Sequence, residues 1–466
     1  MNRLRVHFSS RAVQAIWAIG LGGWLLRLWA VLDYRPTCDE ATDDCYRLAG
    51  DAFYHHHQAD LINQGHWYVN PLEYVFNDGY LIDSAGDPPL YALYLAGWSR
   101  LGADGVTDHR VVSTLGGFAM VVLIGLLARR HAGGTAGVVA AAIAAVHPLL
   151  WINDIMLLSE GFYQPIVVVV LWTAYDWVEH PDRRRVALLG AAIAIATLTR
   201  AEAIALYGFL VLPLVWWGSR LELGEKVRQT LVCGLVGLAV MAPWLIWNQT
   251  RFEKPVTISA VTGTVLMAGA CDEAWSGERM GFWDDCFEAR GLYEEYEATF
   301  PGVSLDPPDR VPYDESVRDE FNREKAFDYY LDNWTRFPKV AVARIGRSLE
   351  FFRVGHTLRM NYQLEGRWEE PSTIGLGMYY ALVPLTIVGG FVLHRARRRL
   401  TPLVAMWPMI MFASATTFGL TRYRVPVDIA MVIMAGAAVA WIIERLRTDP
   451  RTADSVEPPE PVEAAP

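Results

Sequence analysis

Apolar runs long enough to cross a lipid bilayer recur along this chain, and they constrain its fold more than any other feature. A hydrocarbon core of about 30 Å needs roughly 20 apolar residues in a helix. The composition agrees, with 53 % hydrophobic and 20 % charged residues. We therefore predict an all-α polytopic membrane protein with a bundle of about ten transmembrane helices. The expected spans are 12–32, 108–128, 134–150, 159–178, 186–199, 203–217, 228–247, 375–393, 401–418 and 425–443.

Basic residues gather at every second gap between these runs, as at Arg183–Arg185 and Arg395–Arg399. By the positive-inside rule, these gaps and both termini are cytoplasmic. The remaining gaps are then extracytoplasmic, including two long loops, 33–107 and 248–374, which we expect to contain interfacial helices. The prediction is a multi-pass protein of the cell membrane, so that the net charge of −10 says little about partners.

The domain organisation follows from the same pattern. Residues 1–445 form one transmembrane domain that includes the two long loops. Residues 446–466 are rich in Pro, Glu and Ala, and we expect a disordered cytoplasmic tail there.

Cysteine placement agrees with this topology. Four of the five cysteines fall in the two long loops as local pairs, Cys38 with Cys45 and Cys271 with Cys286. An oxidising outer compartment favours two disulfides, and free thiols are the alternative.

The first long loop carries the leading candidate for chemistry, Asp51. It opens a segment, 51–63, that can form a short helix on the membrane face, and in that helix Asp51 and His55 share one side by their i, i+4 spacing. A carboxylate there can accept a proton or hold a metal ion. The plainer alternative is a solvated helix-capping aspartate. We assign Tyr54, His55 and Asp87 to substrate binding around it.

Two further carboxylates, Asp154 and Glu160, fall where the fourth span begins. A carboxylate at the end of an apolar span is costly unless it is paired, coordinating or facing a wet cavity. We favour the cavity, which makes Glu160 a second catalytic candidate. Alternatively, Glu160 lies at a positively polarised helix N-terminus with Ser159 as the cap. Asp51, Glu160 and Asp154 together are candidate ligands of a divalent ion such as Mg, Mn or Zn.

Three arginines stand at the outer boundary, against the positive-inside trend. They are Arg200 before the sixth span and Arg422 and Arg424 before the last one. Because guanidinium binds phosphate with a fork of donors, we assign all three to phosphate binding. The alternative for Arg200 is a simple ion pair with Glu202 or Glu160. Carboxylates beside arginines suit the activation of a hydroxyl nucleophile while a phosphate leaves.

Other motifs narrow the function less. The consecutive histidines, His55, His56 and His57, point three ways on a helix and cannot all bind one metal; a polar face of an interfacial helix is the simpler interpretation. Glycine-rich phosphate loops, nucleophile elbows and HExxH are absent from the sequence, which argues against soluble nucleotide chemistry. We expect no nucleic-acid partner.

The order of several segments resembles the GT-C superfamily of membrane glycosyltransferases. These segments are DAFYHHHQADLINQG, DPPLYALYLA, LLSEGFY, TLTRAEA and GLTRYRVPVD. The branch with the aminoarabinose transferase of lipid A and the protein O-mannosyltransferases is the most similar, and CDEAWSGERMGFWDDC is similar to a cysteine-bracketed motif of actinobacterial members. A departure is the long loop 248–374, where several relatives instead carry a soluble C-terminal domain.

This resemblance implies an inverting hexosyl or pentosyl transferase that takes its sugar from a polyprenyl-phosphate donor. The site would lie at the extracytoplasmic face, in contact with membrane lipid, and the acceptor, a glycan, lipid or protein, stays open. Asp51 matches the family's first-loop aspartate, which acts as catalytic base or metal ligand, and Glu160 matches its second carboxylate, often Asp there. The competing function is a transporter or lipid flippase. Transporters place ionisable residues near the membrane midplane, often with repeated halves.

Overall fold

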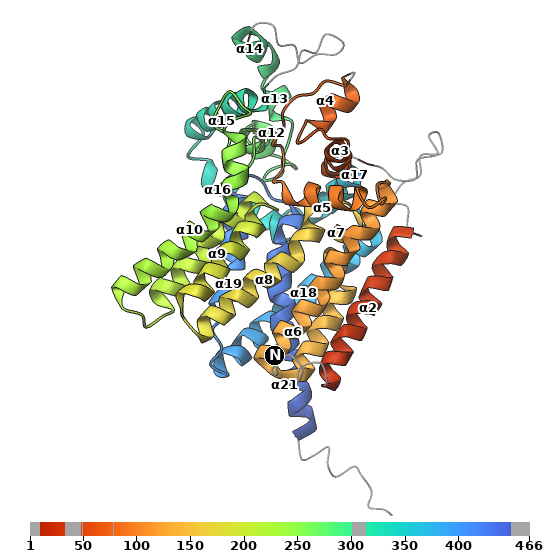
Figure 1. Cartoon of the computed structure of the whole chain (residues 1–466), viewed down its shortest axis with the longest axis vertical. Helices are drawn as coiled ribbons and strands as arrows, with labels where there is room; N and C mark the ends of the chain where they lie inside the picture. The colour runs from red at the N-terminus through yellow and green to blue at the C-terminus, as the bar shows by residue number, and fades with distance from the viewer. Residues whose placement is uncertain (1–9, 33–47, 49, 78, 301–313, 449–466) are drawn as a thin grey trace, which may run out of the picture.

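A bundle of long helices, closed at one end by a cap of short helices, makes up the computed structural model (Figure 1). The structure describes residues 10–32, 48, 50–77, 79–300 and 314–448. The bundle consists of α2 (Arg11–Leu32), α6 (Val106–Val146), α7 (Pro148–Ile155), α8 (Ser159–Glu179), α9 (Arg183–Thr197), η1 (Ala201–Ala205), η2 (Tyr207–Val211), η3 (Pro213–Trp217), α10 (Leu223–Asn248), α18 (Glu369–Arg395), α19 (Thr401–Val404), α20 (Met406–Thr416), η4 (Thr421–Arg424) and α21 (Val425–Thr448). Helix α2 begins, and α21 ends, at the end of the bundle opposite the cap.

Each expected span coincides with a helical segment. Within the described ranges, five helices are long and apolar enough to cross a membrane: Arg11–Leu32, Val106–Val146, Leu223–Asn248, Glu369–Arg395 and Thr421–Arg447. Two shorter apolar segments, Ala201–Trp217 and Thr401–Thr416, match the sixth and ninth expected spans. The predicted all-α, multi-pass membrane fold is confirmed, and the described residues form no β-strand beyond the isolated bridge of Val69 with Asp83.

Helix α6 contains two of the expected spans. At Gly133 the backbone leaves the helix, with φ 88° and ψ 177°, a conformation that favours glycine. The two arms fold back on each other, because a Cβ on Gly137 would lie 2.6 Å from the carbonyl oxygen of Gly125. The predicted boundary between 108–128 and 134–150 is therefore a helical hairpin.

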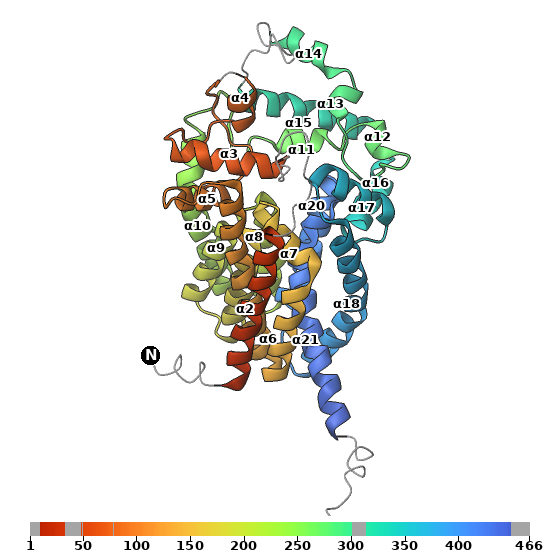
Figure 2. The same ribbon diagram turned by 90° about the vertical axis from the view of Figure 1, so that its right-hand side faces the viewer.

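The last helix, α21, runs through the centre of the bundle (Figure 2). Every residue from Val425 to Ala438 is buried. A helix that is apolar on all sides has to be surrounded by others, and α21 packs on α6 and α18. The central helix begins directly after the arginines of η4, so its packing fixes their position.

The cap comes from the two long loops. Its helices are α3 (Asp51–Asn63), α4 (Pro71–Phe76), α5 (Leu90–Ser99), α11 (Thr262–Met267), α12 (Asp272–Trp275), α13 (Cys286–Ala289), α14 (Leu292–Thr299), α15 (Glu315–Asp332), α16 (Phe337–Ser348) and α17 (Val354–Glu365). Helix α3 has the predicted bounds, lies across the end of the bundle (Figure 2) and packs along α5. Its residues Ala59, Leu61 and Ile62 are buried in protein.

Glu315 of the second loop holds the first loop in place. Its carboxylate accepts hydrogen bonds from Asn70 Nδ2 at 2.7 Å and from the backbone N–H of Ala85 at 2.9 Å. Burial raises the pKa of Glu315 to about 7, against the hydrogen bonds that favour its charged form. The two loops therefore form one layer over the bundle.

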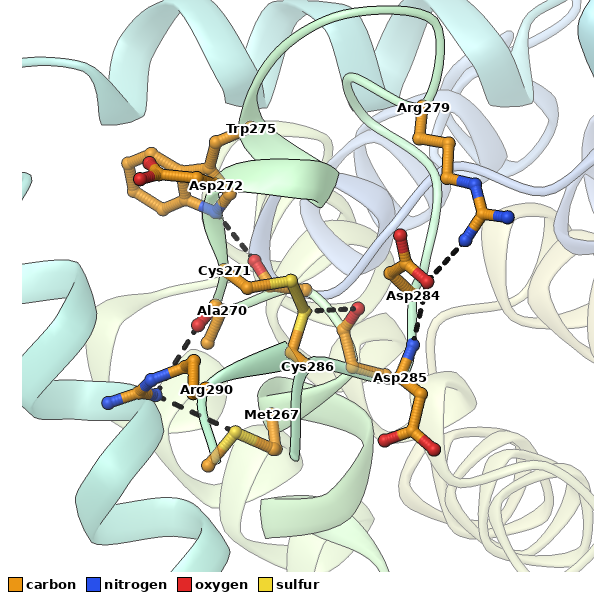
Figure 3. The surroundings of a disulfide bond; sticks show 12 residues. Met267, Ala270, Cys271, Asp272, Trp275, Arg279, Asp284, Asp285, Cys286 and Arg290 are labelled. Carbon is orange, nitrogen blue, oxygen red and sulfur yellow. Dashed lines mark hydrogen bonds and ion pairs between the residues drawn. A yellow bond between two sulfur atoms is a disulfide. The ribbon is translucent and has the colours of Figure 1, made fainter. Parts of the chain in front are cut away.

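One of the two predicted disulfides is present. Cys271 and Cys286 are bonded, with Cα atoms 5.2 Å apart, beside Trp275, whose indole N–H donates to the carbonyl of Gly269 (Figure 3). Cys38 and Cys45 lie outside the described residues. Cys233 is a buried free thiol in α10.

Candidate functional site: an ionic cluster between bundle and cap

Five charged side chains from five segments meet where the bundle joins the cap. We name them the boundary cluster; they are Asp51 of α3, Glu160 of α8, Arg200 before η1, Glu365 of α17 and Arg422 of η4. Three carboxylates surround two guanidinium groups, and all five segments are distant in sequence. The fold therefore assembles a charged site that sequence spacing does not display.

Asp51 lies at the start of α3 but does not cap it. The N-cap residue is Gly50, and no side-chain cap bond forms. Instead, Asp51 Oδ2 lies 2.5 Å from Arg422 Nη1. The Asp51 side chain is 40 % exposed, whereas that of Arg422 is 13 % exposed. The carboxylate is thus open to a ligand while its partner is held inside.

Glu160 lies in the first turn of α8, as the alternative interpretation expected, but Ser159 does not cap this helix. The N-cap is Leu158, and Ser159 Oγ instead accepts a hydrogen bond from Arg200 Nη1 at 3.2 Å. The same Nη1 lies 2.6 Å from Glu160 Oε1. Arg200 Nε also lies 2.6 Å from Glu202 Oε1, so the expected alternative, an ion pair with Glu160 or Glu202, occurs with both.

Glu365 is a site residue that the sequence analysis missed. Its Oε1 lies 3.3 Å from Arg422 Nε, and its Oε2 lies 2.6 Å from Arg367 Nε. Burial favours the neutral form, but Arg367 and Arg422 outweigh it and lower the pKa of Glu365. The only sequence signal was a carboxylate beside Arg367 near the end of loop 248–374.

Contacts with an aromatic ring and with a carboxylate fix the arginines. The guanidinium carbons of Arg200 and Arg422 lie 5.5 Å and 5.9 Å from the ring centroid of Tyr423. Arg422 Nε is also 3.6 Å from Glu160 Oε1. The two guanidinium groups thus share one carboxylate and one aromatic ring, which brings two fixed positive charges close together.

Opposing effects set the pKa of Asp51. Burial favours the neutral form, yet the positive charges of Arg422, His55 and Arg200 and the hydrogen bond from Arg422 lower the pKa to about 2. Asp87 differs, because burial and the charge of Asp51 raise its pKa against the opposing effects of His55 and the arginines.

The other first-loop candidates border Asp51. His55 Nε2 lies 4.0 Å from Asp87 Oδ2. Tyr54 shares a hydrogen bond of 2.8 Å with Ser84 Oγ. Gly86 allows this close packing, because a Cβ there would lie 2.9 Å from the Tyr54 hydroxyl oxygen. His55, Tyr54 and Asp87 therefore form one wall beside the boundary cluster.

Two predicted site residues lie elsewhere. Asp154 is fully buried, 2.5 Å from Arg27 Nε, and accepts a hydrogen bond from Gln164 at 3.0 Å. Arg424 is fully buried, 2.9 Å from Asp428 and 3.5 Å above the ring of Tyr379. Both ion pairs lie inside the bundle and form no ion pair with the five residues of the boundary cluster, so we leave these residues out of the site.

The predicted metal-ligand set does not converge. Guanidinium nitrogens lie 2.5 Å from Asp51 and 2.6 Å from Glu160, where a cation bound to these carboxylates would compete with them, and Asp154 is paired with Arg27. These residues therefore do not fit a divalent ion. Among the described residues, the group that could hold one is His56, His57 and Asp60 of α3.

An apolar cavity of about 670 Å³ lies beside the charged site. Its lining includes Pro89, two residues after Asp87, and Leu198, two residues before Arg200. The remaining lining residues are Trp67, Tyr68, Leu90, Leu93, Val240, Pro243, Trp244 and Trp247. The chain thus places an apolar cavity next to a cluster that contains two guanidinium groups.

Comparison with known proteins identifies one family model and several solved structures that are similar to this chain. A family model described as dolichyl-phosphate-mannose-protein mannosyltransferase matches residues 86–247. No curated protein sequence matches the chain. The matched segment contains Asp87, Glu160 and Arg200, which are three of the residues assembled above.

Solved structures are similar over nearly the whole chain. The archaeal oligosaccharyltransferase AglB from Archaeoglobus fulgidus, in complex with an inhibitory peptide and a dolichol-phosphate, matches with a TM-score of 0.53 at 12 % identity, over 97 % of this chain and 52 % of that one. The Archaeoglobus fulgidus oligosaccharyltransferase tethered to an acceptor peptide matches with a TM-score of 0.50 at 15 % identity, over 94 % and 50 %. This chain thus spans about half the length of the oligosaccharyltransferase chains it matches.

A third match is looser. ArnT from Cupriavidus metallidurans, bound to undecaprenyl phosphate, gives a TM-score of 0.38 at 16 % identity, over 95 % of this chain and 81 % of that one. The family model is described as a mannosyltransferase, and the two Archaeoglobus fulgidus structures are of an oligosaccharyltransferase.

Proposed function

We propose that this protein, which has the fold of the GT-C superfamily of membrane glycosyltransferases, moves a sugar from a polyprenyl-phosphate donor to an acceptor hydroxyl at the boundary cluster. The observation that carries this proposal is the pairing of an accessible carboxylate, Asp51, with a half-enclosed guanidinium, Arg422, at 2.5 Å. One is suited to take a proton and the other to hold a phosphate. The match of residues 86–247 to a family that uses dolichyl-phosphate-mannose supports the lipid donor.

The reaction is a direct displacement. Asp51 accepts the proton of the acceptor hydroxyl, whose oxygen forms a bond to the anomeric carbon. The bond from that carbon to the phosphate oxygen breaks, and its electron pair leaves with the polyprenyl phosphate. Attack from the face opposite the leaving group inverts the anomeric configuration. The donor phosphate is a diester with one negative charge, and the departing polyprenyl phosphate carries a second one on the oxygen that leaves the sugar. The proton taken up by Asp51 balances this charge, and Arg422 and Arg200 stabilise it.

In this proposal, donor binding raises the pKa of Asp51, the catalytic base. A carboxylate whose pKa is about 2 is a weak base, and Arg422 is what holds it there most strongly. A phosphate that binds Arg422 replaces the Asp51 carboxylate as its partner. The pKa of Asp51 then rises, because burial, which favours the neutral form, is no longer opposed to the same extent. The base becomes competent when the donor is in place.

Glu160, Glu202 and Glu365 position the arginines and do not themselves react. Each lies within 3.6 Å of a guanidinium nitrogen of Arg200 or Arg422. Fixed donors stabilise a leaving phosphate more than mobile ones because they need not reorganise. The apolar cavity beside Arg200 suits the first isoprene units of the donor, since its lining is apolar and the arginines that would bind the phosphate lie next to it.

The cap defines the sidedness of this proposal. The basic gaps of the sequence fall at the opposite end of the bundle, as at Arg183–Arg185 and Arg395–Arg399. We take that end as cytoplasmic by the positive-inside rule, with both termini there. The boundary cluster is then extracytoplasmic, on the side where the Cys271–Cys286 bond is expected to persist.

The test is sugar release in nanodiscs from a panel of radiolabelled polyprenyl-phosphate sugars, with wild type and Asp51→Asn side by side. Wild type should release sugar from one donor, and Asp51→Asn should not. Glu320→Gln, a charge change on α15 outside the boundary cluster, is the matched control and should behave as wild type. An active Asp51→Asn protein of normal abundance would end the proposal.

A further inference from the structure

The side of α3 that faces away from Asp51 carries a second set of ligand-forming side chains. At about 100° per residue, His56, His57 and Asp60 lie roughly 140–240° around the helix from Asp51. One ligand atom from each lies within 4.8 Å of the others. His56 is buried, and His57 and Asp60 are half-buried. The proposed transferase mechanism uses none of them.

Hydrogen bonds behind this group can hold His56 in the tautomer that a metal ligand needs. The Ser99 hydroxyl lies 3.2 Å from the carbonyl oxygen of Leu95 and 2.8 Å from His109 Nε2. When its one proton goes to Leu95, it accepts from His109 Nε2, and His109 Nδ1 is left to accept from His56 Nδ1 at 2.9 Å. The proton of a neutral His56 is then on Nδ1, and the lone pair of its Nε2 is available to a metal ion.

This tautomer creates an electrostatic problem that a metal ion solves. The lone pair of His56 Nε2 points outward, and Asp60 Oδ2 lies 3.4 Å from it. A lone pair facing a carboxylate oxygen is repulsive unless a cation lies between them.

We propose that His56, His57 and Asp60 bind a zinc ion on α3, with His109 and Ser99 as the second shell that orients His56. Two imidazoles and one carboxylate are a zinc ligand set, whereas Mg and Ca prefer oxygen alone. Water completes a tetrahedral site, since His57 and Asp60 reach the surface. A metal-bound histidine that donates its other N–H to a fixed acceptor is the expected second-shell arrangement.

The ion would act on the shape of α3. Ligands at positions i, i+1 and i+4 join one turn to the next, so binding favours the helical form of this segment. Helix α3 begins with Asp51, and a firm helix keeps that residue beside Arg422. The zinc site thus lies beyond the proposed transferase chemistry and can be tested without it.

The experiment measures zinc in protein purified with a tag that contains no histidine. After dialysis against zinc-buffered solution, elemental analysis should find one zinc per wild-type chain. His57→Ala and Asp60→Asn should each lose it, and the exposed His180→Gln should retain it. Ser99→Ala should weaken zinc affinity by roughly 10–100-fold in competition with a chromophoric chelator, as for other second-shell groups.

Cobalt substitution gives a second measurement. A tetrahedral site with two imidazoles should give visible absorption bands in wild type that are missing from Asp60→Asn. Asp51→Asn should bind zinc like wild type, which separates this site from the boundary cluster. Wild type without zinc, or zinc retained by both His57→Ala and Asp60→Asn as an adventitious ion only, would overturn the proposal whatever the transferase assays show.

Discussion

The boundary cluster and the ion pairs inside the bundle both consist of arginines and carboxylates, but they serve different roles. Arg27 and Asp154 are both fully buried and 2.5 Å apart, and Arg424 and Asp428 are 0 % and 2 % exposed. Each pair is one positive and one negative charge. In the boundary cluster, two arginines share three carboxylates, Arg200 also pairs with Glu202 beside it, and Asp51 is 40 % exposed.

This difference separates structure from function. In a buried ion pair, each charged group has one partner, and no ligand can reach either group. The role of such a pair is to neutralise the two buried charges. The boundary cluster has more carboxylates than arginines, and one of its carboxylates is exposed. An arginine can therefore exchange that carboxylate for an incoming phosphate and still have a negatively charged partner. Arg422 and Arg424 show the contrast at a spacing of two residues, since one reaches into the cluster and the other packs against Tyr379.

The largest expected effect is on the interior pairs. Asp154→Ala leaves Arg27 buried without its carboxylate, and breaking such a pair costs about 3–5 kcal/mol of stability. Thermal unfolding followed by tryptophan fluorescence in detergent should show a strongly lowered midpoint. The double variant Arg27→Met with Asp154→Leu should recover most of the loss. An unchanged midpoint in Asp154→Ala would remove the distinction between the two regions.

The next largest effect is on turnover in the boundary cluster. Arg422→Gln removes one donor to the leaving phosphate, and losing such a donor lowers the rate by about 10²–10³-fold. Its unfolding midpoint should stay close to that of wild type, since the carboxylates reach solvent or Arg200 and Arg367. Sugar release and unfolding are measured on the same preparation. A normal rate with a lowered midpoint would make Arg422 a structural residue like Arg424.

The packing around the interior pair of Arg27 and Asp154 gives a further prediction. A Cβ on Gly117 would collide with both Asp154 Oδ2 and Arg27 Nε. Gly117→Ala should therefore lower the unfolding midpoint, by about 1–3 kcal/mol in stability. Gly97→Ala is the matched control, since nothing lies within 4 Å of the added methyl group. Equal midpoints for the two variants would contradict the tight packing around the pair.

The pH profile tests whether donor binding frees Asp51. Its pKa is lowered to about 2 in the free protein, with Arg422 the strongest cause that lowers it. The base is active when deprotonated, so activity is retained above this pKa and lost as pH falls through it. The acidic limb of kcat/KM should therefore lie at lower pH than that of kcat, which reports the donor complex.

Arg422→Gln should move the acidic limb of kcat/KM to higher pH, because burial then raises the pKa with less opposition. His180→Gln, far from the boundary cluster, should leave both limbs in place. Coincident limbs in wild type would mean that Asp51 keeps its arginine throughout the reaction.

The smallest effect on the rate is expected for Glu202, at the edge of the boundary cluster. Arg200 contacts both Glu160 and Glu202 at 2.6 Å, and the Glu202 side chain is 21 % exposed. Glu202→Gln should change the rate less than tenfold, since a partly exposed pair contributes about 0–1 kcal/mol. Glu160→Gln, at 1 % exposure, should cost more. A reversed order would show that Glu202, and not Glu160, fixes Arg200.

The sequence was sufficient for the fold because lipid imposes length and apolarity on each span. The helix 51–63 was predicted with its observed bounds, and the break in 108–150 falls at Gly133. Periodicity and flanking charge are local signals, so they locate elements well.

The site was only partly predictable because its contacts are long-range. Asp51 meets Arg422 across 371 positions and Asp154 meets Arg27 across 127, and neither spacing carries a pattern. The positive-inside pattern singled out the arginines at the predicted outer boundary as unusual. Whether each one faces the cluster or the interior depends on the turn of η4 and on the packing of α21, which the sequence does not display. Glu365 stands beside Arg367 in the sequence, but nothing in that stretch indicates that it reaches Arg422.

The most direct test compares Arg422→Gln with Arg424→Gln for binding of undecaprenyl phosphate in nanodiscs, with thermal unfolding measured alongside. We predict that Arg422→Gln loses lipid-phosphate binding and keeps the wild-type unfolding midpoint, whereas Arg424→Gln lowers the midpoint and the folded fraction still binds. If Arg422→Gln binds the lipid phosphate as wild type does, the boundary cluster is not a phosphate site and the proposed function fails.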